Sequence, residues 1–317
     1  MDPPLGAWLE ATSGPDEDFV DTLWRTVLRR PVEPEVRADA LTRLDGGMSR
    51  ATLLAELAAS TEFARVRLLD DGVAWAAAQR RAGERPRDLA APPGTDERPI
   101  EIPWCLSRYA GEPRLLDVGY AFAEPAYLAG LVALGAHELV GVDLVAAEVP
   151  GLTSVVADLR ELPFEDAAFG AAVAISTLEH VGRDNSQYGL AAEHDDDSLD
   201  RALRELRRVL AADGRLLVTV PTGPGELLPE QAAFAPSEWV ARFEAAGFLV
   251  WEDELYELGA DGWQSVTAVS EEARYGARGP GASAVLCAEL RPSTLAARMR
   301  LGIRDRRYRD DVRRVTG

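Results

Sequence analysis

From Arg114 onward, short apolar runs alternate with amphipathic segments, and this alternation constrains the fold more than any other feature of the sequence. Strands separated by helical segments favour βαβ units around a parallel sheet. We therefore expect an α/β domain with helices on both faces of its sheet. The expected strands are residues 114–119, 137–144, 153–159, 169–176, 215–221, 248–258 and 282–290.

Residues 16–70 show a different pattern, in which apolar side chains repeat at helical spacing. Pro31 and the pair Gly46-Gly47 are typical of helix ends, and Ser49 and Ser60 are typical N-caps of the helices that follow. Four parts of the chain are therefore expected. They are an N-terminal helical domain at 1–81, a Pro-rich linker at 82–104, the α/β domain at 105–291 and an Arg-rich helix or tail at 292–317.

The composition excludes several kinds of chemistry. The chain has 317 residues and is 47% apolar, which is enough for a large core. All 34 basic residues are Arg, so Schiff-base chemistry and a lysine-bearing phosphate loop are excluded. Two Cys residues are too few for a disulfide framework and fit a reducing compartment. Since no signal-peptide pattern and no apolar run of ~18 residues is found, we expect a cytoplasmic protein without a transmembrane segment.

Charge is spread unevenly along the chain, whose net charge is −19. Proteins that bind nucleic acid need a basic surface, so this class of function is disfavoured. Residues 291–317 nevertheless contain nine Arg and three Asp. This segment is either solvated and folded back on an acidic body, or a docking segment for a partner or an anionic surface. A homodimer or a protein partner, bound through the N-terminal domain or this tail, stays open.

The first two expected strands each end in an acidic residue. Asp117-Val118-Gly119 closes the first strand before a helix, and a strand, a Gly turn and a helix N-terminus form a cradle for a cofactor. Asp143 closes the second strand, where a carboxylate can accept hydrogen bonds from both hydroxyls of a ribose. A dinucleotide site, as in nicotinamide-dependent oxidoreductases, and an S-adenosylmethionine site both have these features.

Three details favour the S-adenosylmethionine site over the dinucleotide site. The carboxylate of Asp117 would repel a pyrophosphate but attract the ammonium group of a methionine. Asp158 ends the third strand, where it could accept a hydrogen bond from an adenine amino group. After residue 221 the chain continues with a strand, a long connection and a last strand, and not with a second mononucleotide-binding half.

Residues 105–290 resemble the class I S-adenosylmethionine-dependent methyltransferases. Five segments carry the resemblance, in the expected order and spacing: LLDVGYAFAEP, LVGVDL, VVADLRELPFED, AISTLEHVG and LRELRRVLAADGRLLVTVP. The resemblance implies a Rossmann-like, seven-stranded methyltransferase sheet with S-adenosylmethionine as the cofactor. It also implies the cofactor-binding residues. They are Asp117 and Gly119 at the methionine end, Asp143 at the ribose, Asp158 and Leu159 at the adenine, Ser176 and Thr177 near the sulfonium, and Ala121 and Leu144 beside them.

The first motif departs from the family pattern, which usually has two further glycines where this chain has Ala121 and Ala123. Ala tolerates a positive φ poorly and adds a methyl group where a ligand must approach the backbone. A non-catalytic module that binds cofactor or a partner is therefore a second hypothesis.

His180 is the candidate catalytic base, because it follows the fourth strand at the sheet edge where ligands bind. It could instead pack the strand exit or bind a metal. Relatives that bind a divalent metal have an acid three residues before the Glu-His pair, where this chain has Ser176. We therefore expect no metal.

The acceptor site is expected near the polar segment 182–198, which follows the fourth strand. Asp184 and Tyr188 are candidate hydrogen-bonding residues, and Trp263 is a candidate apolar wall. Alternatively, the segment 182–198 is an ordinary surface loop, and Trp263 only packs in the core.

The N-terminal segments FVDTLWRTVLRRPVEPE and GGMSRATLLAELAASTEF resemble a small helical domain of unknown function that often stands beside bacterial glycan-modifying enzymes. Together the two resemblances imply a bacterial methyltransferase that acts on an oxygen of a sugar, a glycan or another small molecule. A non-sugar secondary metabolite is the alternative acceptor.

Overall fold

The computed structural model describes residues 14–190, 194–279 and 281–302, which belong to two compact units divided between Asp71 and Gly72. The first unit is helical, as predicted. Its helices are α2 (Asp16–Val27), α3 (Pro34–Asp45), α4 (Arg50–Ala58) and the beginning of α5 (Thr61–Ala82). The hydroxyls of Ser49 and Ser60 accept hydrogen bonds from the amides of Thr52 and Phe63, both at 3.1 Å, which confirms the two predicted N-caps.

The first unit has its own apolar core, which explains why its short helices are stable. The helices pack through side chains at helical spacing. The buried members are Phe19, Val20, Leu23, Trp24, Leu28, Ala40, Leu44, Leu53 and Leu54. Isolated helices of this length are marginal in water, so burial of this shared face supplies most of their stability.

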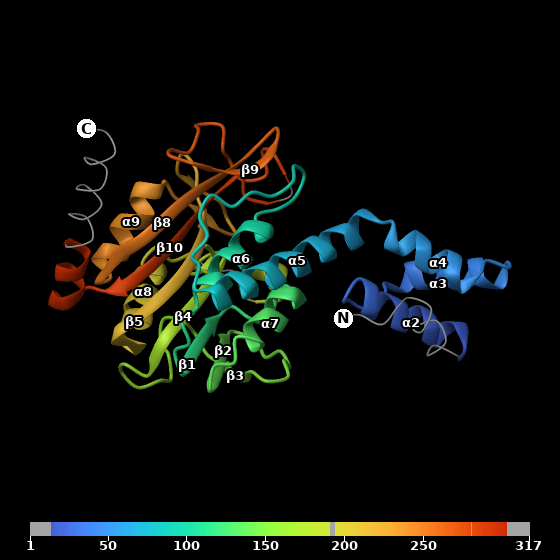
Figure 1. The fold of residues 1–317 in the computed structure, drawn as a ribbon, viewed down its shortest axis with the longest axis horizontal. Helices are drawn as coiled ribbons and strands as arrows, with labels where there is room; N and C mark the ends of the chain where they lie inside the picture. The colour runs from blue at the N-terminus through green and yellow to red at the C-terminus, as the bar shows by residue number, and fades with distance from the viewer. Residues whose placement is uncertain (1–13, 191–193, 280, 303–317) are drawn as a thin grey trace. The chain divides into compact units, whose positions relative to one another are not determined.

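The second unit is built on a sheet of eight strands in the order β3-β2-β1-β4-β5-β10-β8-β9 (Figure 1). The strands are β1 (Arg114–Val118), β2 (Glu138–Asp143), β3 (Thr153–Val156), β4 (Phe169–Ile175), β5 (Leu210–Pro221), β8 (Phe248–Gly259), β9 (Gly262–Val266) and β10 (Ala284–Pro292). The first five are parallel to one another, whereas β10 runs antiparallel to both β5 and β8. The predicted α/β class is confirmed, and β9 is an eighth strand that the sequence pattern did not reveal.

Helices cover both faces of this sheet. On one face lie α8 (Ser198–Val209) and α9 (Pro236–Ala245), and on the other lie α6 (Arg98–Arg108) and α7 (Pro125–Val132) (Figure 1). The core under α8 and α9 includes Leu203, Leu206 and Phe243, which pack on alternate residues of β1, β2, β4 and β5. This alternation places one set of strand side chains under each helical layer.

The Pro-rich segment 82–104 is extended only in its first part, because α6 begins at Arg98 and contains Pro103. The amide of Trp263 on β9 donates to the carbonyl of Ala91 at 2.8 Å, so the first part of the segment runs along the edge of the sheet. Two short 3-10 helices, η1 (Leu178–His180) and η2 (Ser186–Tyr188), follow β4, and a small hairpin, β6 (Glu226–Leu227) and β7 (Ala232–Ala233), follows β5. Most of the predicted Arg-rich tail lies outside the described residues.

No helix among residues 14–190, 194–279 and 281–302 has both the length and the apolar character that crossing a bilayer requires.

A buried ion-pair network joins α6 to β8. The guanidinium of Arg108 is fully buried, lies 2.7 Å from Glu254 and 3.3 Å from Glu252, and stacks on Trp104. Glu254 also accepts hydrogen bonds from Trp104 and from Tyr256. Every charge in this group has an opposite charge in contact, so the network can be buried without a large desolvation penalty.

We predict that Glu254→Gln lowers the free energy of unfolding by about 3–5 kcal/mol, because it breaks a buried ion pair from one side. The measurement is urea denaturation at neutral pH. Asp166→Asn is the matched control, since Asp166 pairs with Arg208 at 2.9 Å but is 81% exposed, and we expect a change below about 1 kcal/mol. Equal effects of the two substitutions would show that Glu254 contributes no more than a surface ion pair.

Candidate cofactor and acceptor site

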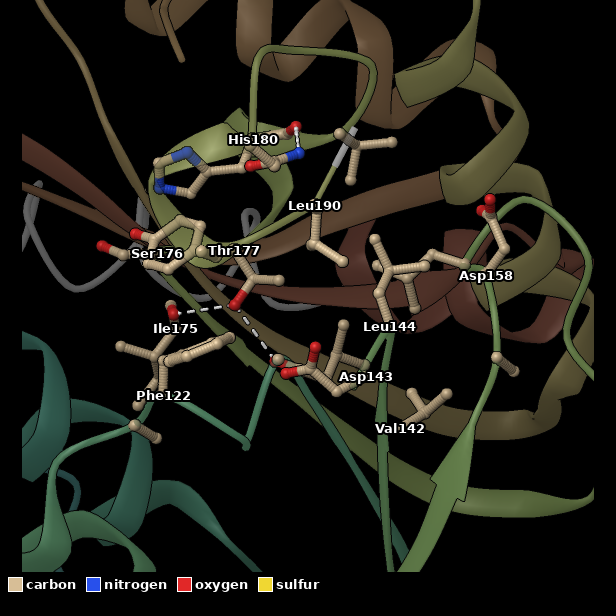
Figure 2. A pocket seen from close by; sticks show the side chains of 18 of the residues that line it. Phe122, Val142, Asp143, Leu144, Asp158, Ile175, Ser176, Thr177, His180 and Leu190 are labelled. Carbon is tan, nitrogen blue, oxygen red and sulfur yellow. Dashed lines mark hydrogen bonds between the residues drawn. The ribbon is translucent and has the colours of Figure 1, made fainter. Parts of the chain in front are cut away.

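A pocket opens at the carboxyl ends of β1, β2 and β4, the edge at which parallel sheets bind ligands (Figure 2). The space within it is about 1230 Å³ when the open solvent at its mouth is included. Most of the predicted site residues line it. They are Gly119, Asp143, Leu144, Asp158, Leu159, Ser176, Thr177, His180 and Tyr188.

Gly119 forms the turn after β1, and no other residue fits its place. Its φ of +85° is a conformation that residues with a Cβ rarely adopt. A Cβ at this position would also lie 2.3 Å from Oγ1 of Thr177, which belongs to the turn after β4. The Thr177 hydroxyl is fixed by donating to the carbonyls of Val118 and Ile175 at 3.1 and 3.0 Å. The turn after β1 therefore needs glycine both for its backbone conformation and for the close approach of Thr177.

Asp143 ends β2, and its carboxylate points into the pocket between Phe122 and Leu144 (Figure 2). Its Oδ2 accepts a hydrogen bond from the amide of Ala121 at 3.0 Å, which holds the turn after Gly119 in place. A carboxylate has about four acceptor positions, so others stay open for the hydroxyls of a ribose.

Ala121 and Ala123 do not need the conformations that only Gly adopts. Neither is among the residues with a positive φ in the described part of the chain. Ala123 lines the pocket, while Ala121 binds Asp143 through its amide. The two replacements in the first motif therefore impose no backbone strain on this turn.

Asp117 lies below the pocket at the end of β1 and is 1% exposed. Its Oδ1 accepts a hydrogen bond from the hydroxyl of Tyr127, and its Oδ2 has no partner among the described residues. Burial raises the pKa of Asp117 to about 7, and the nearby charge of Asp143 acts in the same direction. An orphaned buried carboxylate oxygen at this place fits an ammonium group of a bound ligand.

Two large apolar side chains, Phe122 and Leu144, line the pocket and are 56% and 45% exposed. Exposed apolar side chains inside a pocket suit a flat ring. Asp158 lies on the side of Leu144, away from Phe122 (Figure 2), and Arg160 holds both of its oxygens at 2.6–3.0 Å. The hydrogen bond from Arg160 lowers the pKa of Asp158, so its carboxylate is ionised at neutral pH.

Ser176 lies at the opposite side of the site from Asp158 (Figure 2). Its φ of +42° is strained for a residue with a side chain. The hydroxyl of Ser176 donates to Oε1 of Glu101 on α6 at 2.8 Å. The turn after β4 is thus fixed by Thr177 toward β1 and by Ser176 toward α6.

His180 lies on η1 at the wall of the pocket and is half-buried. Its Nδ1 is 2.7 Å from the carbonyl oxygen of Glu230. A carbonyl only accepts hydrogen bonds, so Nδ1 carries the proton and Nε2 is the free acceptor of the neutral ring. Burial lowers the pKa of His180, which keeps the ring neutral at physiological pH. The ring packs edge-on against Tyr188, which in turn contacts Phe122.

The predicted acceptor residues separate into two groups. Tyr188 and its neighbour Asn185 line the pocket. Asp184 does not line it, because its Oδ1 accepts a hydrogen bond from the amide of Ser186 at 2.9 Å and begins η2. Trp263 does not line it either, since it is fully buried on β9, at the other edge of the sheet, with its indole donating to the carbonyl of Thr95. The assignments of Asp184 and Trp263 to the acceptor site are corrected accordingly.

Several residues of the site were not expected from the sequence. Arg98 and Phe122 line the pocket, and Tyr127 binds Asp117. Arg98 was missed because it stands in a segment with several Pro residues, which indicates an extended chain. The sequence does contain a signal for α6, since Pro99 is in the first turn of the helix, where Pro is favoured. Among the described residues, no group of three or more His, Cys, Asp or Glu side chains is arranged to hold a metal ion.

The raised pKa of Asp117 has a consequence for stability. The native protein binds this proton more tightly than the unfolded chain, whose Asp has a pKa near 3.8. Ionisation therefore lowers the free energy of unfolding as the pH rises from about 4 to about 7, by up to about 4 kcal/mol. We predict that the free energy of unfolding of Asp117→Asn increases relative to that of the wild type as the pH rises over this range. Above this range the difference should stay constant.

The measurement is urea denaturation of both proteins at several pH values between 4 and 8. Asp213→Asn, at an exposed position, is the control and should differ from the wild type equally at every pH. A difference for Asp117→Asn that does not change with pH would show that this carboxyl ionises normally.

Comparison with known proteins assigns part of the chain to a family. Residues 116–218, from β1 to β5, match the family described as methyltransferase domain. No curated protein matches the sequence.

Similar solved structures include methyltransferases of low sequence identity. A 1,6-didemethyltoxoflavin-N1-methyltransferase from Burkholderia thailandensis, solved with S-adenosylhomocysteine, is 18% identical, with a TM-score of 0.43 over 74% of this chain and 92% of the other. A putative methyltransferase from Haloferax volcanii, in complex with the Trm112 activator, is 18% identical, with a TM-score of 0.43 over 72% and 98%. A possible histamine N-methyltransferase from Thermotoga maritima is 15% identical, with a TM-score of 0.39 over 61% and 87%.

These similarities are too weak to carry an argument, so the fold rests on the strand order described above. The match to a methyltransferase domain covers residues 116–218, the part of the chain that contains most of the predicted cofactor-binding motifs.

Proposed function

We propose that the protein transfers the methyl group of S-adenosylmethionine to an oxygen of a sugar, a glycan or another small molecule. The observation that carries the transfer reaction is a pocket that is lined by the Gly119 turn, where Asp143 presents open acceptor positions and Phe122 provides an apolar face. The antiparallel strands β10 and β8 stand where a dinucleotide-binding sheet has its second mononucleotide-binding half. This topology disfavours a dinucleotide as the cofactor.

Each of these residues has a task in binding the cofactor. The sulfonium of S-adenosylmethionine supplies an already activated methyl group. Asp143 accepts hydrogen bonds from the ribose hydroxyls, and Asp117 attracts the ammonium of the methionine end through its unpartnered oxygen. Leu144, whose side chain is 45% exposed on the side of Asp158, contacts the flat base. The protein then has to align the acceptor and to exclude water.

His180 would remove the proton of a hydroxyl acceptor through Nε2. Its hydrogen bond to the Glu230 carbonyl fixes the ring orientation, and its lowered pKa keeps Nε2 available as a base. Proton removal by a positioned base contributes about 10²–10⁴-fold to a rate. The contact with Tyr188 places this base next to the polar segment that follows β4.

The oxygen acceptor is supported by the groups that line the pocket around His180. Asn185, Tyr188, Ser176 and Arg98 offer hydrogen-bonding side chains there, which suits a polyhydroxylated molecule. The resemblance of the N-terminal unit to domains beside glycan-modifying enzymes supports a sugar over a phenol or carboxylate. The same proposal includes a partner that binds the N-terminal unit or the Arg-rich segment. It also includes a cytoplasmic location, because both Cys residues are free thiols, as is usual in a reducing compartment.

The first test is calorimetric titration of the whole protein with S-adenosylmethionine and, separately, with NAD. Micromolar binding of S-adenosylmethionine alone is expected. Turnover is then followed by release of S-adenosylhomocysteine in a screen of glycosides and phenols. Binding without turnover on any acceptor would favour the non-catalytic module, and binding of NAD would overturn the proposal.

We predict that Asp143→Ala weakens binding of S-adenosylmethionine by about 1.5–3 kcal/mol, about tenfold to 150-fold, because charge-assisted hydrogen bonds to the ribose are lost. Calorimetry measures the affinity of both proteins. Asp213→Ala, at an exposed position away from the pocket lining, is the matched control and should bind like the wild type. An unchanged affinity of Asp143→Ala would remove Asp143 from the ribose site.

We predict that His180→Ala lowers kcat by about 10²–10⁴-fold while the affinity for S-adenosylmethionine changes less than about threefold. The pH profile of kcat should lose its dependence on a group that titrates below the usual pKa of His. The control is His137→Ala, at an exposed position outside the pocket. If His180→Ala turns over as fast as the wild type, His180 only packs the end of β4.

A further inference from the structure

Three aromatic side chains that line the pocket form a continuous row. The ring centroids of Phe122 and Tyr188 lie 4.8 Å apart, and those of Tyr188 and His180 lie 5.9 Å apart. We call these three residues the aromatic row. It connects the loop after β1, which carries Phe122, to the 3-10 helices η1 and η2 that follow β4.

The aromatic row stands on the side of the pocket that the base of the cofactor does not use. Figure 2 shows Phe122, Ser176 and His180 on one side of the site and Asp158 on the other. In the proposed function the base lies toward Asp158, and Ser176 lies near the sulfonium. The side that carries the aromatic row is therefore the one from which an acceptor would approach the methyl group.

Phe122 is the member of the aromatic row that is most open to a ligand, since it is 56% exposed although it lines a pocket. The backbone on both sides of it is fixed. The amide of Ala121 donates to Asp143 at 3.0 Å, and the amide of Ala123 donates to the carbonyl of Tyr120 at 3.1 Å. The ring is thus held as a fixed apolar part of the pocket wall.

Two polar side chains beside the aromatic row use their donors within the protein. The amide nitrogen of Asn185 donates to the carbonyls of His180 and Arg183 at 3.0 and 3.2 Å, and the hydroxyl of Ser176 donates to Glu101 at 2.8 Å. Both side chains keep only acceptor positions for a ligand. A ligand that fits this region therefore donates from a hydroxyl group and presents an apolar face to Phe122.

An aromatic ring fits the exposed part of Phe122 better than an alkyl group of the same size. Aromatic pairs in tilted or edge-to-face geometry gain stability beyond the area that they bury, because the positive edge of one ring meets the negative face of the other. The aromatic row already packs in this way, with interplanar angles of 37° between Phe122 and Tyr188 and 86° between Tyr188 and His180. A ring of the acceptor on Phe122 would extend the row.

We propose that the methyl acceptor carries an aromatic ring, which packs on the exposed part of Phe122 while a hydroxyl beside this ring faces Nε2 of His180. The proposal rests on the proposed function and names the substrate class for the same site. An aryl glycoside and a phenol both supply this chemistry. Phe122 is then a specificity-determining residue for the acceptor, whereas Leu144 contacts the base of the cofactor.

Two pairs of probes differ only in the aromatic character of one ring. The first pair is phenyl β-glucoside and cyclohexyl β-glucoside, and the second is phenol and cyclohexanol. Each probe is titrated calorimetrically into the whole protein saturated with S-adenosylhomocysteine. Phenyl β-glucoside should bind about twofold to tenfold more tightly than cyclohexyl β-glucoside. A preference for the aromatic member of the second pair alone also supports the proposal and identifies a phenol as the source of the ring.

Two variants of Phe122 test the assignment of this residue. Phe122→Leu should remove the preference for the aromatic probe, while S-adenosylhomocysteine binds within about threefold of the wild type. Phe122→Trp keeps an aromatic ring and should keep the preference. Leu144→Ala should show the converse of Phe122→Leu, with weaker binding of S-adenosylhomocysteine and an unchanged preference. Trp75→Leu is the matched control, since Trp75 on α5 is 38% exposed but does not line the pocket, and it should change neither quantity.

The outcomes separate this proposal from the proposed function. Failure of S-adenosylhomocysteine to bind the wild type would overturn the proposed function itself. If it binds but the members of both pairs bind equally, or no probe binds, only the aromatic acceptor is overturned. A preference that survives in Phe122→Leu would also overturn it, because the ring would then be held elsewhere. Weaker binding of S-adenosylhomocysteine to Phe122→Leu, with the preference intact, would assign Phe122 to the cofactor instead.

Discussion

The contact between Gly119 and Thr177 is the constraint on which the rest of the site depends. It joins the turns after β1 and β4, the two neighbouring strands at the centre of the sheet, at a distance that leaves no room for a Cβ. Because the Thr177 hydroxyl is bonded to carbonyls on both strands, neither turn can move without the other. The carboxylate of Asp143 then fixes the next turn through Ala121, and the cofactor pocket is the space that remains above these three strands.

The order of strands and the position of the pocket could be predicted because the signal is local. Each strand is an apolar run of the right length, and each functional acid stands at the end of its strand. The strand β9 and the helix α6 were not predicted, because β9 is a short edge strand and α6 contains two Pro residues. Periodicity does not reveal such elements, since tertiary contacts stabilise them.

The individual contacts within the site were less predictable. The sequence shows that Asp158 follows the third strand and that Asp184 follows the fourth. It does not show that Arg160 binds the carboxylate of Asp158, or that the carboxylate of Asp184 begins η2. Trp263 was assigned to the acceptor wall on its aromatic character alone, and its burial on β9 depends on a pairing with residue 91, far away in sequence. Long-range partners of this kind decide whether a polar or aromatic side chain is functional or structural.

The place of β10 in the sheet has a consequence for synthesis of the protein. Although β10 is the last strand among the described residues, it lies between β5 and β8 and joins β8 to the parallel strands of the sheet. On the ribosome, β5 therefore presents an open edge until residue 292 has left the exit tunnel. An unpaired edge next to a parallel sheet invites pairing with other nascent chains. The sheet of the nascent protein therefore stays incomplete until β10 is inserted, although all residues of the proposed cofactor site have been synthesised by then.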